Sequence, residues 1–234
     1  MSEIPIVVEE ARDDFEAVIE ILDKTVDRSG GFRTQSRLVA SNAAMLILAA
    51  IFEEAARQLG TAFIRAYFTT ERPDDPRSKA LRSGLWERSC KNLSLNQYGN
   101  RSFDQNSASS WLTVLYDGAF NGSSLSDHGH RAMYNDRNMR VSELNKLFSR
   151  LGFQNISQSI GRSIDFRRFF LVDSVGAAHA KFEDFLNEFY EKRNEATHDL
   201  SNFRSGGAVD VRRYAEFLNL TIQRTGAVLE DALA

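Results

Sequence analysis

Apolar residues along the chain recur mainly at the three- and four-residue spacing of an amphipathic helix, which predicts an all-α protein. Only Pro5, Pro73 and Pro76 interrupt the sequence, so long stretches are free of strong helix breakers. Amphipathic helices are predicted over residues 11–26, 38–67, 141–151, 175–189 and 211–229.

Polar and glycine residues mark where several of these helices should begin or end. The first predicted helix stops before Gly30 and Gly31, which can adopt the left-handed conformation that terminates helices. Ser142 is a candidate N-cap for the third helix, and Asp173 or Ser174 for the fourth.

Residues from about 72 to 138 weaken the helical pattern. Clusters of Asn, Ser, Gly and Asp surround short apolar pieces there, as in "NLSLNQYGNRS" and "NGSSLSDHGH". We therefore expect an insertion of short helices and loops within one domain that spans residues 1–234. The chain contains no internal repeat or low-complexity tract that would suggest a different organisation.

Composition indicates a globular protein with a sizeable core, since 42% of the residues are hydrophobic. Cys90 is the only cysteine, which excludes an intramolecular disulfide and a cysteine-cluster zinc site. The N-terminus does not have the pattern of a signal peptide. The longest apolar run, "AAMLILAAIF", is about half of the roughly 20 residues that span a bilayer. We expect a soluble, cytoplasmic protein that does not associate with membranes.

Charge is distributed unevenly along the chain. The formal net charge is −3, but residues 72–168 hold fifteen Lys and Arg against nine Asp and Glu, and the remainder holds fourteen against twenty-three. An overall acidic chain argues against general affinity for nucleic acids. The basic middle either attracts phosphate groups locally or offsets acidic helices within one fold.

The segment "EKRNEATHDL" directly follows the fourth predicted helix and contains Arg193, Asn194 and His198 within six positions. On a helix, Asn194 and His198 share a face, while Arg193 lies about 100° from Asn194 and about 140° from His198. The three side chains of a single copy of this segment therefore cannot all contact the same ligand. In a purely structural role, Arg193 would pair with Glu191 or Glu195, and His198 would end the helix, where the dipole favours its charged form.

The stretch "RNEATH" resembles the R-x4-6-H motif of the HEPN superfamily, at the end of an amphipathic helix that is followed by one more helix. "SNAAMLILAAIFEEAARQL" is similar to the long helix of the RiboL-PSP-type HEPN branch. In that branch an Asn opens an apolar stripe leading to a Phe-Glu pair, here Phe52 and Glu53. The resemblance covers most of the chain and implies an up-and-down HEPN-like helical bundle, with about 72–138 as an inserted loop and short-helix region.

This resemblance implies a metal-independent endoribonuclease without a cofactor, in which two motifs of a homodimer line one cleft. His198 would act as general base or acid for attack by the RNA 2′-hydroxyl. Arg193 would hold the phosphate and stabilise its developing charge, and Asn194 would orient the phosphate or the imidazole. The expected products end in a 2′,3′-cyclic phosphate. RNA is then the substrate, in a toxin or anti-phage defence effector with an antitoxin or defence-system partner protein.

A second function stays open, namely a non-catalytic HEPN-like module that dimerises or binds a partner protein or nucleotide. Arg193 and His198 would then serve the structure. HEPN toxins that are silenced by nucleotide addition carry a Tyr two residues after the His. Leu200 stands at that position, which argues against this mode of control.

The other histidines offer weaker candidates. His128 and His130 in "SDHGHR" have a spacing found in some metal sites, but no further ligand stands in a known register, so no metal site is expected. His179 has apolar neighbours and is expected to be a packed helix residue. Because the chain contains no G-x-S-x-G elbow, phosphate-binding loop or dinucleotide fingerprint, hydrolase, P-loop and Rossmann assignments have no support.

Overall fold

The computed structural model describes residues 2–26, 34–69, 75–95, 104–121, 125–134, 137–198 and 207–234. Within these ranges no residue lies in a β-strand, and the predicted all-α helical bundle is confirmed. In chain order the elements are α1 (Ile4–Val26), α2 (Thr34–Tyr67), α3 (Pro76–Leu95), α4 (Gln105–Thr113), the π-helix η2 (Val114–Asn121), α5 (Leu125–His128), the 3-10 helix η3 (Gly129–Met133), α6 (Val141–Ser149), α7 (Ile156–Gly161), α8 (Ile164–Phe169), α9 (Val175–His198) and α10 (Ala208–Asp231).

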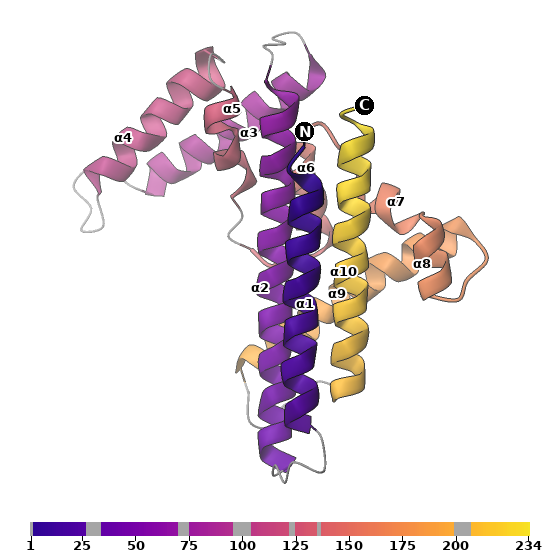
Figure 1. Cartoon of the computed structure of the whole chain (residues 1–234). Coiled ribbons are helices and arrows are strands. Elements are labelled where there is room, and N and C mark those ends of the chain that lie inside the picture. Colours follow the sequence, from indigo (N-terminus) through magenta and orange to yellow (C-terminus); the bar gives the residue numbers. More distant parts are fainter. Residues whose placement is uncertain are drawn as a thin grey trace.

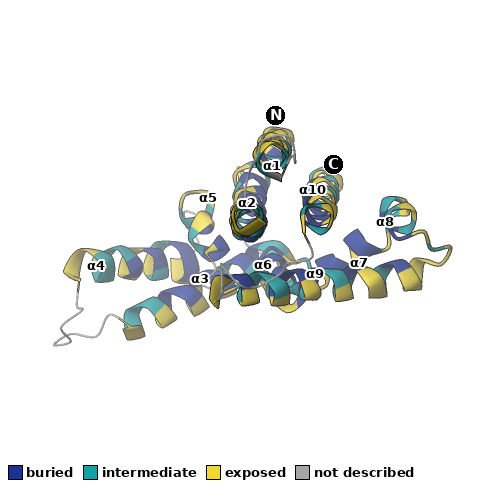
Figure 2. Ribbon diagram, turned by 90° about the horizontal axis from the view of Figure 1, so that it is seen from below, coloured by how far each residue is buried: buried dark blue, intermediate teal, exposed yellow. Residues whose placement is uncertain are grey.

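Three long helices, α1, α2 and α10, run side by side and form one layer of the molecule (Figure 1). Viewed along these helices, α3, α6, α9 and α7 lie across them as a second layer (Figure 2). The elements from α3 to η3, which we call the arm, extend to one side of α2, whereas α7 and α8 lie on the other. The arm lies within residues 72–138, the region in which the sequence analysis expects short helices and loops.

Helix α2 is buried along most of its length because it contacts both layers. It packs against α1 and α10 on one side and against α9 and η3 on the other. The buried positions recur with the helical period predicted from the sequence. They include Met45, Leu48, Phe52, Leu59 and Phe63.

The same helix is long and apolar enough to cross a membrane by length and composition alone. Its most apolar 18-residue window is 44% buried, and its neighbours there are other helices of the chain. Core helices of soluble proteins share these properties, so α2 by itself does not place the chain in a membrane.

An aromatic cluster fixes α8 against α9 and α10. The ring of Phe217 on α10 lies within 6.1 Å, centroid to centroid, of five other phenylalanine rings. These are Phe166, Phe169 and Phe170 around α8, and Phe182 and Phe185 on α9. Edge-to-face and tilted pairs of this kind add specific geometry to apolar burial.

Two of the predicted helix caps can be compared with the structure. The prediction at Ser174 is confirmed, because its hydroxyl accepts a hydrogen bond from the Ala177 amide at 3.0 Å. The prediction at Ser142 is wrong, since Val141 already belongs to α6 and Arg140 is the N-cap residue, without a side-chain capping bond. Burial of Val141 in the core draws the helix start forward. The predicted stop at residues 30–31 lies outside the described residues.

The arm is more regular than the sequence pattern suggested, because α3 alone has 20 residues. At the end of the arm, η3 is held against the end of α6 by the buried side chain of Arg150. The Arg150 guanidinium donates to the Ala132 carbonyl at 2.7 Å and to the Tyr134 carbonyl at 3.2 Å. One buried cation thus ties the end of the arm to the second layer.

The end of α8 has an unusual backbone conformation. Leu171 has a φ of +52°, the Leu171 amide donates to the Arg168 carbonyl at 3.2 Å, and the Val172 amide donates to the Arg167 carbonyl at 2.9 Å. This is a Schellman turn, in which glycine usually occupies the left-handed position. A leucine there costs about 1–2 kcal/mol. The Leu171 side chain is 91% exposed, so burial within the chain does not offset this cost.

We expect Arg150→Ala to lower the free energy of unfolding by about 1–3 kcal/mol, because two carbonyls at the end of the arm lose a charged donor. Urea denaturation followed by circular dichroism measures this difference. Lys181→Ala is the control, since Lys181 is exposed, and its effect should stay within about 0.5 kcal/mol. Equal effects of the two substitutions would contradict the anchoring role.

Candidate functional site

The last two turns of α9 carry the residues that the sequence singled out. Tyr190 and Ala196 are fully buried and hold this part of the helix against the core. Arg193 and Asn194 are half-buried, and His198, the last residue of α9, is exposed. Leu200, which stands where silenced HEPN toxins carry a tyrosine, lies outside the described residues.

Asn194 is held by a residue from the segment just before α6. The Asn138 side-chain amide donates to Asn194 Oδ1 at 2.7 Å. The same oxygen accepts a bond from Arg193 Nη1 at 3.3 Å. Asn194 therefore links the segment before α6 to the Arg193 guanidinium, and it helps to set the direction in which that guanidinium points.

Arg193 is not neutralised by the acidic residues beside it in the sequence. Glu191 instead contacts Arg140, with 3.6 Å between Oε1 and Nη1. Within the described residues no carboxylate lies within ion-pair distance of Arg193, and its Nε is buried without a hydrogen-bond partner. Because Nε is buried, an external anion would bind through the Nη groups of this half-buried guanidinium, which no described carboxylate neutralises.

A buried tyrosine lies beside this guanidinium. Burial raises the pKa of Tyr190 well above its usual value, and the adjacent Glu53 carboxylate raises it further, while Arg193 acts in the opposite direction. The Tyr190 hydroxyl thus stays protonated at neutral pH. Glu53 belongs to the Phe-Glu pair recognised in the sequence, and the packing of α2 on α9 brings it next to the motif.

His198 stands apart from this cluster. It lies one turn beyond Asn194, and no hydrogen bond orients its ring within the described part of the chain. A single chain therefore positions Arg193 and Asn194 together, while His198 lies one turn along the face of Asn194 and is directed away from Arg193. This agrees with the angular separation expected from the helix.

The remaining histidines lie elsewhere in the fold. His128 ends α5 and His130 is the second residue of η3, and among the described residues no three metal-binding side chains of His, Cys, Asp or Glu come together. His179 packs on α7, where a Cβ at Gly161 would lie 3.1 Å from its ring. Its Nε2 is 3.3 Å from Glu183 Oε1. His179 is thus a packed helix residue, as expected.

Sequence reasoning missed three contributors to the site, namely Asn138, Arg140 and Tyr190. Tyr190 could have been found from its position one turn before Arg193 on the buried side of the helix. Asn138 and Arg140 could not, because they meet α9 across a sequence separation of more than 50 residues.

Comparisons with protein-family models, with curated proteins and with solved structures find no match for this chain.

The contact between Asn138 and Asn194 can be tested with a double-mutant cycle. We expect Asn138→Ala and Asn194→Ala each to lower the free energy of unfolding by about 0.5–1.5 kcal/mol. The double variant should lose less than the sum, because both changes remove the same hydrogen bond. Strict additivity in urea denaturation would show that the two side chains do not interact.

Proposed function

We propose that the protein is a metal-independent endoribonuclease with a composite active site at a homodimer interface. The observation that carries the proposal is the state of Arg193. It is half-buried, oriented by Asn194, and free of any carboxylate partner in the described residues. Glu53 lies nearby, beside Tyr190, but forms no ion pair with Arg193, and a partly buried cation without a directly paired acid is stabilised by a ligand that supplies negative charge. The resemblance of "RNEATH" to the HEPN motif supports RNA phosphate as that ligand.

Each residue of the motif has a chemical role in this proposal. Arg193 binds the non-bridging oxygens of the scissile phosphate and stabilises their developing charge. His198 takes the proton of the 2′-hydroxyl as it attacks phosphorus, or donates a proton to the leaving 5′-oxygen. The bond to the 5′-oxygen breaks, leaving a 2′,3′-cyclic phosphate. Asn194 acts through Arg193, since its carbonyl oxygen faces that guanidinium rather than the open side of the helix.

The homodimer supplies what one chain lacks. His198 is exposed at the end of α9 and is separated from Arg193 around the helix. A two-fold axis near this end would bring the His198 of one copy toward the Arg193 of the other. We further propose a cytoplasmic toxin or anti-phage defence effector, restrained by an antitoxin or defence-system partner protein.

Removal of His198 should abolish cleavage without unfolding the protein, because the exposed imidazole contributes little packing. We expect His198→Ala to reduce the cleavage rate of total RNA in EDTA by about 10²- to 10⁴-fold. His130→Ala, at an exposed histidine outside the site, serves as the matched control. If His198→Ala cleaves as fast as the parent, the enzyme proposal fails and the non-catalytic binding module replaces it.

A composite site also predicts complementation between two inactive variants. Arg193→Ala and His198→Ala should each be inactive alone. After mixing and subunit exchange, a heterodimer keeps an intact Arg193 on one chain and an intact His198 on the other. Cleavage should therefore reappear. Absence of rescue in heterodimers verified by mass spectrometry would rule out sharing of these residues between subunits.

Arg193→Lys should be nearly as inactive as Arg193→Ala, with a loss of about 10²- to 10³-fold in single-turnover cleavage. Lysine keeps the positive charge but lacks the planar fork that holds two phosphate oxygens at once. RNA binding at fixed salt is measured in parallel, because a lysine should retain most of the non-specific attraction. Near-parental cleavage by the Lys variant would mean that Arg193 acts through charge alone.

A further inference from the structure

The turn after α8 presents an exposed apolar and basic stripe that the proposed active site does not use. Ile164 and Arg168 are four residues apart and share one exposed side of α8, and Leu171 follows directly after the C-cap residue Phe170, in the turn that ends the helix. Ile164 is 48% exposed, and Leu171 is the most exposed of the large hydrophobic residues in the described part of the chain. The aromatic cluster holds the opposite side of α8. The stripe thus stands on a rigid support.

The backbone at Leu171 indicates that this stripe serves binding. Leucine occupies a left-handed position that glycine would fill without strain, yet its side chain packs against nothing that would compensate. Strained positions of this kind cluster at functional sites. A partner that covers Leu171 would supply the missing burial.

The charges around the stripe define what the partner must offer. Arg162 and Arg168 are exposed and have no ion pair or hydrogen bond from their side chains within the described residues. Asp165, the acid within α8, is already paired with Arg224 of α10, and the exposed Asp173 after Leu171 leaves two exposed arginines against one exposed carboxylate. The partner therefore needs an apolar groove with carboxylates at its rim.

A groove of this kind lies on the same chain, between α1 and α10. It has a volume of about 510 Å³, and Phe15, Ile19 and Ala215 provide its apolar lining. Carboxylates of Glu16, Glu20, Asp23 and Glu216 also line it, with Arg212 as the cation, paired to Asp23 at 2.6 Å.

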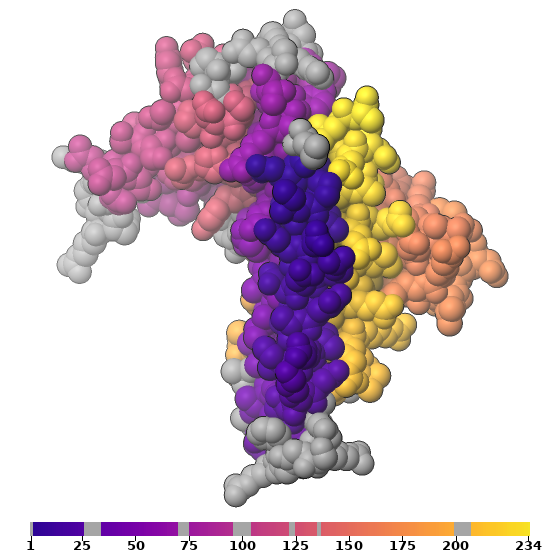
Figure 3. All heavy atoms as spheres, viewed as in Figure 1, coloured from indigo at the N-terminus to yellow at the C-terminus, as the bar shows by residue number. Residues whose placement is uncertain are grey.

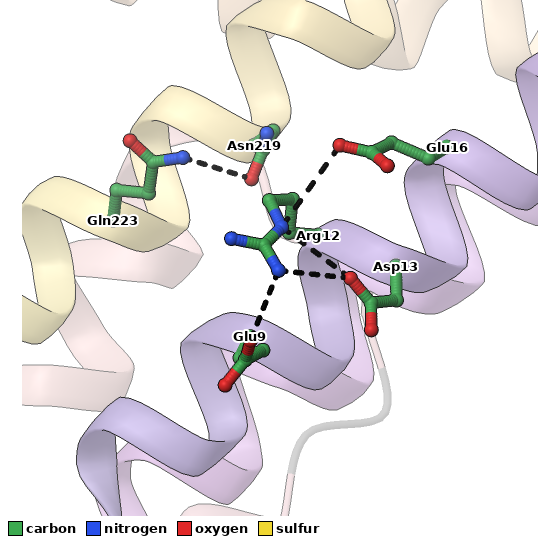
Figure 4. A network of polar contacts seen from close by, with 6 residues as sticks. All are labelled: Glu9, Arg12, Asp13, Glu16, Asn219 and Gln223. Carbon is green, nitrogen blue, oxygen red and sulfur yellow. Dashed lines mark hydrogen bonds and ion pairs between the residues drawn. The ribbon is translucent and has the colours of Figure 1, made fainter.

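Two of these carboxylates keep much of their negative charge available. Glu216 has no ion pair in the described part of the chain. Glu16 is 3.9 Å from Arg12, whose closer contacts, at 3.1 Å, are with Glu9 and Asp13 (Figure 4). The rim of the groove is thus net negative, where the α8 stripe is net positive.

We propose that the α8 stripe of one copy docks into the α1–α10 groove of a second copy. Leu171 enters the groove, and Arg162 and Arg168 face Glu16 and Glu216. In one copy, α1 and α10 form the long column while the α8 region projects at its side (Figure 3). The contact is heterologous, joining different surfaces of two copies, and is separate from the end of α9.

Sedimentation velocity of the full chain, over a range of concentrations and at two salt concentrations, measures this association. Leu171→Gly is the central variant, because it relieves the backbone strain while removing the apolar anchor. It should raise the thermal midpoint of unfolding and weaken the association by at least about tenfold. A merely structural leucine would not move the two readouts in opposite directions. Association of Leu171→Gly equal to that of the parent would overturn the proposal.

A charge exchange tests the choice of groove. Arg168→Glu and Glu216→Arg should each weaken association by about tenfold or more, since like charges then face each other. An equimolar mixture of the two variants should recover it, because each supplies the surface that the other has lost. Failure of the mixture to recover, or binding of the parent stripe to anionic vesicles without any self-association, would sink the assignment.

These results are independent of the ribonuclease proposal. The stripe variants should cleave RNA like the parent and keep the α9-mediated dimer. His198→Ala should keep the stripe-mediated association. Loss of cleavage in Leu171→Gly would show that the two interfaces are not separate, and would contradict the proposed docking.

Discussion

Burial of α2 along nearly its whole length is the constraint on which the rest of the structure depends. Its apolar stripe is too long for one neighbouring helix to cover, so α1 and α10 cover part of it and α9 and η3 cover the rest. Helix α2 therefore joins the two layers, and contacts of α10 with α7 and α9 add to this link. Glu53 lies within this helix, which is why a polar residue of the core reaches the end of α9.

The candidate site forms where three segments distant in sequence converge. Helix α2 supplies Glu53, the segment before α6 supplies Asn138, and α9 supplies Arg193 and Asn194. Folding keeps the guanidinium partly buried but gives it an amide oxygen as its neighbour instead of a carboxylate. An ion pair with Glu191 would have satisfied the fold more simply, yet Glu191 contacts Arg140. The arrangement favours an anion that arrives from outside the chain.

The apolar periodicity of the sequence located α1, α2, α9 and α10, because each buries one continuous face. The spacing of apolar residues within a single helix is enough to reveal such a face. It placed the start of α1 too late, at residue 11 instead of Ile4, because Pro5 was read as a breaker although the first turn tolerates proline. Helices α7 and α8 were missed, since six residues are too few to display a period. The motif residues were found from the sequence, but the contact between Asn138 and Asn194 depends on tertiary packing and has no local signal.

The hydrogen bond between Asn138 and Asn194 lies between the arm and the candidate site. Arg150 holds the end of the arm on α6, and Asn138, only a few residues beyond the arm, touches the amide that orients Arg193. A shift of the arm that displaces Asn138 must reorient Arg193. With the anion binding proposed for Arg193, the two regions would be thermodynamically linked: a molecule that binds and moves the arm would change the affinity of Arg193 for the anion, and the anion would change the affinity of the arm by the same factor.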